Sequence, residues 1–119
     1  MKKISEVKMN IQIIGTKKCK DTAKAERFFK ERKIKYQFID LKQRNLSKGE
    51  LTKIANKFGL ENLINKEGKE FEKQNLKYMR YDIQDKILEH SLLLKTPIVR
   101  NGKEMTLGLQ IEIWKNWLI

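Results

Sequence analysis

The chain has 119 residues, 27 Lys and Arg against 15 Asp and Glu, a formal net charge of +12, one cysteine and one histidine. This length fits a single domain with a modest core, and a hydrophobic share of 39% is that of a globular protein rather than a disordered one. One cysteine and one histidine exclude an intramolecular disulfide and a zinc site made of cysteine and histidine ligands.

The first third of the chain predicts a strand, a helix and a second strand. Residues 10–14 are a short run rich in β-branched isoleucine, which favours a strand. Residues 20–33 have helical periodicity, and residues 36–41 again favour a strand. The helix places its apolar side chains on one face, at Ala25, Phe28 and Phe29. Because crossovers of this kind join parallel strands, we expect the two strands to be parallel.

The middle of the chain, residues 47–90, predicts a helical block. Ser47 followed by Glu50 is the pattern of a capping box, and Gly59 ends the helix that these residues begin. The apolar residues of that helix repeat at helical spacing: Leu51, Ile54, Ala55 and Phe58. Beyond it we expect a short apolar turn and two further helices, over 60–64, 69–77 and about 82–90.

The last part of the chain predicts a hairpin and a final helix. Residues 92–100 lead into a strand, Asn101-Gly102 is a two-residue hairpin signal, and residues 103–107 form the returning strand. Gly108 opens a helix whose apolar positions are Ile111, Ile113, Trp114, Trp117 and Leu118, and we expect both tryptophans to pack rather than to bind a ligand. The order of elements predicts an α/β, thioredoxin-like domain. Its four-stranded mixed sheet is flanked by helices, and the insertion 47–90 separates 1–46 from 91–119.

Cys19 lies in the loop after the first predicted strand, directly ahead of a predicted helix. Backbone N–H groups at a helix N-terminus stabilise a thiolate, and Lys17, Lys18 and Lys20 act in the same direction. Since the thiolate is the reactive form, this placement favours a nucleophile. The alternative is a structural cysteine that packs as a small hydrophobic residue.

Two further residues have two interpretations each. Thr22 stands where a second cysteine would resolve a mixed disulfide; its hydroxyl either binds the thiolate or caps the first turn of the helix. Pro97, in the pair Thr96-Pro97, either forms a cis bond that aims a backbone group at the cysteine loop or simply begins a strand.

The excess of basic residues first suggests a nucleic-acid binder. The lysines are spread along the whole chain and alternate with glutamate, which is typical of a solvated surface, so we do not expect direct nucleic-acid binding. No apolar run approaches the roughly 20 residues of a membrane span, and residues 1–6 have no apolar stretch behind them, so we expect a cytoplasmic protein without an export signal. His90 ends a predicted helix and is expected to be solvated rather than catalytic.

The chain resembles the ArsC/Spx branch of thioredoxin-fold proteins, which includes glutaredoxin-coupled arsenate reductases and the Spx transcription regulators. The resemblance covers the chain from about Asn10 to Leu118. It rests on the order and spacing of these stretches: Gly15–Cys19, Ala25–Phe29, Leu63–Gly68, Leu94–Val99, Gly102–Lys103 and Leu107–Gly108.

The resemblance implies that Cys19 is the nucleophilic cysteine and Pro97 the cis-proline facing it. It further implies an oxidoreductase that binds no cofactor and uses glutathione or glutaredoxin as an external thiol. The family usually has an arginine where Thr96 stands, and an arginine in the helical block that is missing here. Lys95 or Arg100 are the candidate substitutes, although lysine lacks the planar fork that binds oxyanions. These departures weigh against arsenate as the substrate.

The alternative that the resemblance leaves open is a Spx-like regulator that binds RNA polymerase. Spx proteins often carry a Cys-x-x-Cys redox switch, which Thr22 removes here. A single thiol could still be modified by a small thiol.

Overall fold

A computed structural model describes residues 10–118; residues 1–9, including the segment considered above for export, and residue 119 lie outside the described part. The elements are β1 (Ile11–Gly15), α2 (Lys20–Glu31), β2 (Tyr36–Asp40), α3 (Lys48–Phe58), α4 (Leu60–Leu63), α5 (Lys69–Lys73), η1 (Leu76–Tyr78), α6 (Ile83–Glu89), η2 (Ser91–Leu93), β3 (Ile98–Asn101), β4 (Glu104–Leu107) and α7 (Ile111–Trp117).

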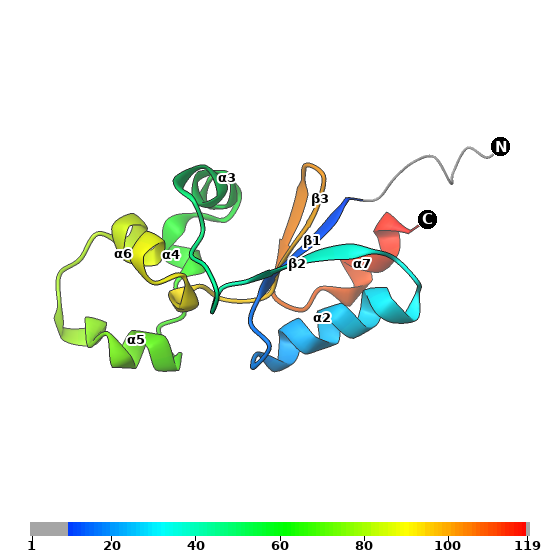
Figure 1. The fold of residues 1–119 in the computed structure, drawn as a ribbon. Coiled ribbons are helices and arrows are strands. Elements are labelled where there is room, and N and C mark those ends of the chain that lie inside the picture. The colour runs from blue at the N-terminus through cyan, green and yellow to red at the C-terminus, as the bar shows by residue number, and fades with distance from the viewer. Residues whose placement is uncertain (1–9, 119) are drawn as a thin grey trace.

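The four strands form one mixed sheet in the order β2-β1-β3-β4 (Figure 1). β1 is parallel to β2 and antiparallel to β3, and β3 is antiparallel to β4. The predicted parallel crossover and hairpin are therefore confirmed. Because β1 lies in the middle and ends at Gly15, the loop that follows it opens at the edge where β3 begins.

Helices cover both faces of the sheet, as predicted. α2 and α7 pack on one face, where Phe28, Phe29 and Trp114 are within 5.5 Å of one another between ring centroids. The opposite face contacts the insertion through Ile14 and Ile98, which share a core with residues of α3, α4 and α6. Figure 1 shows the insertion helices gathered at one end of the sheet. Alternation of side chains along each strand supplies one apolar set to each face.

The capping box predicted at the start of α3 is present. Ser47 Oγ accepts a hydrogen bond from the Glu50 N–H at 3.2 Å, and Glu50 Oε1 accepts one from the Ser47 N–H at 2.8 Å. The arrangement satisfies two backbone donors that a helix N-terminus otherwise leaves unpaired. Gly59, with φ of 85°, ends the helix.

Three predicted boundaries were wrong. The helix expected over 69–77 is broken into α5 and η1 by Asn75, whose φ of 58° is left-handed. Asn101 pairs with Glu104, so the hairpin loop is Gly102-Lys103 rather than Asn101-Gly102, and the loop glycine has a φ of 61°. The final helix begins at Ile111, because Gly108 has a φ of 84° and cannot open it. In addition, the turn expected over 60–64 contains the short helix α4.

Candidate functional site

Cys19 is the N-cap residue of α2, as its position in the sequence predicted. The Cys19 N–H donates to the Thr16 carbonyl at 3.2 Å, which closes the loop after β1, and the Cys19 carbonyl accepts from the Ala23 N–H at 3.0 Å. The thiol is partly buried and has no disulfide partner. The local backbone therefore holds the sulfur at the N-terminus of α2, where N–H dipoles stabilise a negative charge.

Thr22 lies one turn into α2 and is fully buried. Its hydroxyl has no hydrogen-bond partner while Cys19 carries its proton, whereas a Cys19 thiolate can accept a hydrogen bond from it. Gly15 provides the space for this side chain: a Cβ at Gly15 would lie 2.8 Å from Thr22 Cγ2 and closer still to Oγ1. Thr22 thus supports a thiolate rather than resolving a disulfide.

The segment that leads into β3 also contacts the Cys19 sulfur. The Thr96-Pro97 peptide bond is cis, in agreement with what the family resemblance implied. The Cys19 thiol donates to the Thr96 carbonyl, with Sγ and O 3.7 Å apart. Residues 77 positions apart in sequence therefore meet at the sulfur.

The pKa of Cys19 lies below its ordinary value of 9.0. Burial raises the pKa, but hydrogen bonds from the Thr22 and Thr96 hydroxyls and from the backbone N–H groups of Thr22 and Asp21 outweigh it. The sequence suggested that neighbouring lysines cause this effect. Lys17 instead lies 3.4 Å from Glu26 and over the ring of Phe38, so that the hydroxyl and backbone donors account for the shift.

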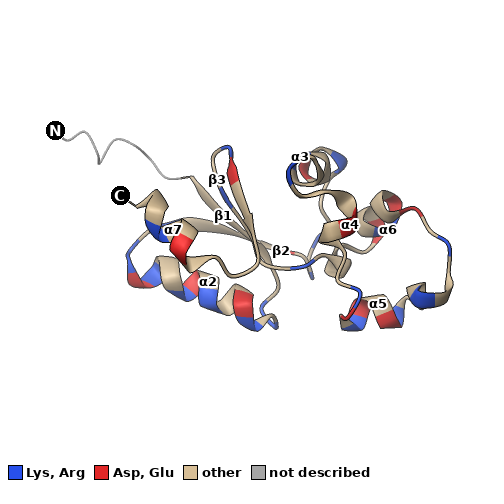
Figure 2. Ribbon diagram, turned by 180° about the vertical axis from the view of Figure 1, so that it is seen from behind, with Lys and Arg blue, Asp and Glu red and all other residues tan. Residues whose placement is uncertain are grey.

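A pocket of about 350 Å³ opens at Cys19. The start of α5 lies opposite the start of α2 (Figures 1 and 2). The lining residues come from the loop before α2, the segment before β3 and the insertion: Thr16, Cys19, Asn65, Gly68, Lys69, Glu70, Leu92, Leu94 and Thr96. The pocket therefore lies between the thioredoxin-like part and the insertion.

The structure brings only some of the candidate residues to this pocket. Cys19 and Thr96 line it, with Pro97 buried beside Thr96 and Thr22 buried beneath the sulfur. Lys18 lines an adjoining pocket of about 240 Å³ that shares Thr16 and Leu92 with the first. Lys20 and Lys95 are exposed and line neither pocket, and Arg100 lies further along β3, opposite Gln12. Neither proposed substitute for the missing arginine therefore faces the sulfur.

Sequence reasoning missed the charged pair at the start of α5, Lys69 and Glu70. No local pattern distinguishes these residues, and the stretch that carried the family resemblance stops one residue earlier, at Gly68. They line the same pocket as Cys19 because residues 63–65 are hydrogen-bonded to the segment before Pro97: the Lys95 N–H donates to the Leu63 carbonyl at 2.7 Å, and Ile64 and Leu94 form an antiparallel bridge.

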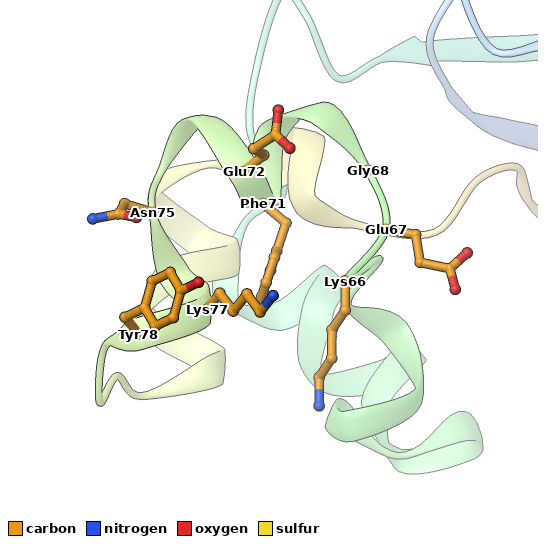
Figure 3. Close-up of a pocket in the computed structure, with 8 residues that line it drawn as sticks. All are labelled: Lys66, Glu67, Gly68, Phe71, Glu72, Asn75, Lys77 and Tyr78. Atoms are coloured by element: carbon orange, nitrogen blue, oxygen red, sulfur yellow. The ribbon is translucent and has the colours of Figure 1, made fainter.

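A second cavity of about 380 Å³ lies on the other side of Gly68, which lines both spaces. Figure 3 shows its lining side chains, with the carboxylates of Glu67 and Glu72 pointing away from the ring of Phe71. It contains neither Cys19 nor His90. Two lysines, Lys66 and Lys77, line this second cavity, and neither of them lines the Cys19 pocket.

The remaining polar side chains of the described residues form no second candidate site. His90 is the C-cap residue of α6, with its Nδ1 3.9 Å from Glu70 Oε2. Within residues 10–118, no group of three or more histidine, cysteine or carboxylate side chains is placed to hold a metal ion. No helix in the same part of the chain is long and apolar enough to cross a membrane. Basic and acidic residues are interspersed along the helices rather than separated into one basic face (Figure 2).

Solved structures with this fold are numerous. One described as the YffB (PA3664) protein has a TM-score of 0.80 and 22% identity, covering 92% of this chain and all of that one. An arsenate reductase from Vibrio cholerae has a TM-score of 0.76 and 18% identity over 92% and 98% of the two chains. SACOL0876 from Staphylococcus aureus COL has a TM-score of 0.68 and 26% identity over 92% and 99%. A search of curated proteins found no match.

A family model supplies the stronger result. The model for the ArsC family matches residues 14–116, which include Cys19, the insertion and the Thr96-Pro97 segment. The fold of the structural neighbours agrees with it. The chain therefore belongs to the ArsC family of arsenate reductase-related, thioredoxin-fold proteins.

Proposed function

We propose that the protein is a thiol-dependent oxidoreductase in which Cys19 is the nucleophile. The observation that carries this proposal is the position of the Cys19 sulfur: at the start of α2, with a lowered pKa, and open to a pocket of about 350 Å³. A lowered pKa increases the thiolate fraction near neutral pH, and the thiolate is the attacking species. Thr22 and Thr96 stabilise it without providing a second thiol.

The reaction takes its second thiol from outside the chain. Cys19 is the only cysteine in the sequence, so a covalent adduct on its sulfur cannot be resolved within one chain. We propose that a small thiol such as glutathione, or a glutaredoxin, attacks that adduct and restores the Cys19 thiolate.

The pocket supports an organic disulfide as the reacting partner better than arsenate. Among the described residues that line it, Lys69 is the one cation, and Glu70 offsets its charge. A multiply charged oxyanion would be left largely uncompensated, and lysine does not bind it in a bidentate manner. Thr96, next to Pro97, supplies no positive charge either.

The pH dependence of Cys19 alkylation tests the nucleophile. We expect the rate of reaction with iodoacetamide to rise through a midpoint below 9.0, because the folded protein lowers the pKa of the thiol. Thr22→Val should move the midpoint upward, since it removes the hydroxyl donor but keeps the volume. Thr22→Ser should leave the midpoint close to that of the wild type. A wild-type midpoint at or above 9.0 would count against an activated thiol.

A comparison of substrates tests the reaction. Wild type and Cys19→Ser are assayed in parallel with arsenate, using glutathione and glutaredoxin as reductants, and with the mixed disulfide of glutathione and 2-mercaptoethanol, using glutathione without glutaredoxin, because glutaredoxin would itself reduce that disulfide. We expect the mixed disulfide to be turned over only when Cys19 is present, and arsenate to be reduced poorly. Equal activity of the two proteins would remove Cys19 from the mechanism, and faster turnover of arsenate would correct the substrate.

A further inference from the structure

We propose that the free edge of β4 binds an extended acidic segment of a partner protein, which adds to the sheet as a strand antiparallel to β4. β4 is the last strand in the order β2-β1-β3-β4, so one of its two sides has no strand beside it. All four residues of β4 line a groove of about 410 Å³, and no residue of this groove also lines the Cys19 pocket. The binding surface is therefore separate from the chemistry proposed for Cys19.

The register of the hairpin shows which backbone groups of β4 point away from the sheet. The Gly108 N–H donates to the Pro97 carbonyl at 2.8 Å, and opposed residues of an antiparallel pair alternate between bonded and non-bonded positions. Met105 and Leu107 therefore make no backbone bond to β3, and their N–H and C=O groups point outward. Within residues 10–118, only the Leu107 carbonyl among these groups has a partner, Gln110 Nε2 at 3.1 Å. The remaining three groups are available to an added strand.

The side of the groove toward α3 presents a positive charge. Met105 and Leu107 pack against the core cluster that contains residues of α3, so their side chains lie on that face of the sheet. Lys57, near the end of α3, is exposed and lines the groove with them, and no carboxylate in residues 10–118 lies within ion-pair distance of it. An added-strand residue opposite Met105 points to the same face, so a carboxylate at that position would pair with Lys57.

The side of the groove toward α7 favours an apolar side chain. Glu104 lies on this side, where its Oε1 accepts a hydrogen bond from Trp117 Nε1 at 2.7 Å, and it would repel a second carboxylate. Ile113 lines the groove beside Trp117 and remains 42% exposed. An added-strand residue opposite Thr106 points to this side and would cover Ile113. Because side chains alternate along a strand, the segment that fits the edge alternates acidic and apolar residues.

A second copy of this chain fits the edge less well. Antiparallel pairing of two β4 strands requires a two-fold axis perpendicular to the sheet, so the α3 sides of the two copies would meet on one face. Each Lys57 would then share that face with the same lysine of the other copy, and each chain has a formal net charge of +12. Like charges oppose this assembly, whereas an acidic segment is attracted by the same charges.

The test uses an acetylated and amidated peptide, Glu-Val-Glu-Val-Glu, and isotope-labelled protein. We expect the peptide to shift the amide signals of β4 in NMR spectra and to slow hydrogen exchange at Met105 and Leu107. Exchange at Thr106, whose N–H already bonds to β3, should change much less. Replacement of the glutamates by lysines should lower the affinity at least about tenfold. An unchanged spectrum at millimolar peptide, or equal affinity for both peptides, would overturn the proposal.

Methylation of the peptide backbone distinguishes strand addition from attraction between charges alone. In the antiparallel pairing, peptide residues opposite Met105 and Leu107 direct their N–H groups to β4, whereas a residue opposite Thr106 directs its N–H to solvent. N-methylation of the glutamates should therefore lower the affinity about tenfold or more, since it removes these donors. N-methylation of the valines should change it less than about twofold. Equal effects would overturn strand addition, and the reverse order would overturn the antiparallel direction.

Matched protein variants test the side chains. Lys57→Ala should weaken binding about two- to fivefold, as expected for an exposed ion pair, and the difference should vanish at about 1 M salt. Lys53→Ala, one turn earlier on α3 and outside the groove, should bind as wild type, and an equal loss in both variants would overturn the role of Lys57. Cys19→Ser should also bind as wild type, so failure of the proposed oxidoreductase activity leaves this inference standing.

Sedimentation without peptide tests the competing occupant. We expect a monomer whose Met105 and Leu107 amides exchange at rates independent of protein concentration. A dimer that slows exchange at these two amides as concentration rises would identify a second copy as the occupant and overturn the assignment to an acidic partner.

Discussion

Gly15→Ala is the substitution whose effect follows most directly from the geometry beneath Cys19. A Cβ at Gly15 would lie 2.8 Å from Thr22 Cγ2, 3.1 Å from Thr22 Cβ and closer still to Oγ1. Thr22 is 0% exposed, so its side chain has no free space into which to move. Added volume in a packed core costs about 1–3 kcal/mol, and the reduced entropy of the unfolded chain offsets about 0.4–1 kcal/mol of this.

We therefore expect Gly15→Ala to lower the free energy of unfolding by about 1–2 kcal/mol, or the Tm by about 4–8 °C for a domain of this size. The measurements are urea denaturation and a thermal scan followed by circular dichroism. Gly49→Ala is the matched control: Gly49 is an exposed residue of α3 with nothing within 4 Å of a built Cβ, so it should be neutral or slightly stabilising.

The double variant Gly15→Ala/Thr22→Ala identifies the cause. Removing Oγ1 and Cγ2 of Thr22 leaves only its Cβ at 3.1 Å, so the two substitutions should couple favourably by more than about 1 kcal/mol. Gly15→Ala alone should also displace the Thr22 hydroxyl and raise the pKa of Cys19 toward its ordinary value. A Gly15→Ala protein as stable as the wild type, or strictly additive effects, would refute this reasoning.

Three further predictions concern stability. Ser47→Ala should cost about 1 kcal/mol in urea denaturation, because the capping box loses its hydroxyl; an unchanged midpoint would contradict the role of the cap. The hydrogen bond from Arg44, the largest cause, lowers the pKa of Glu50 from 4.5 to about 2. This stabilisation is complete above pH 4.5 and is lost as the pH falls toward 2, so the free-energy difference between wild type and Glu50→Gln should shrink over that interval; a constant difference would argue against it. Trp114→Phe should cost about 2–4 kcal/mol, since it leaves a cavity and removes the 2.8 Å hydrogen bond from Trp114 Nε1 to Thr106 Oγ1. The Tm measures this cost, which should be smaller in a Thr106→Val background, where the hydrogen bond is already missing; an equal cost in both backgrounds would contradict a contribution from that bond.

Local sequence patterns were sufficient to predict most of the helices and strands. Three features depend only on residues within a few positions of one another: the β-branched run after Asn10, the apolar face of α2 and the Ser47–Glu50 cap. Each of them can therefore be predicted from the local sequence. The break at Asn75 was missed because a single left-handed residue leaves the apolar spacing on either side almost unchanged. The hairpin was predicted in kind but displaced by one residue, since pairing across β3 and β4 decides its register.

The sequence by itself determined that Cys19 is a single thiol at the start of a helix, in a chain with the order of elements of its family. Only the tertiary structure decided what surrounds the sulfur. The Ile64–Leu94 bridge brings the insertion against the segment before Pro97, and this places Lys69 and Glu70 at the pocket while Lys95 and Arg100 remain outside it. The physical reason is that the identity of a pocket's charges depends on long-range pairing, which neither periodicity nor local charge patterns encode.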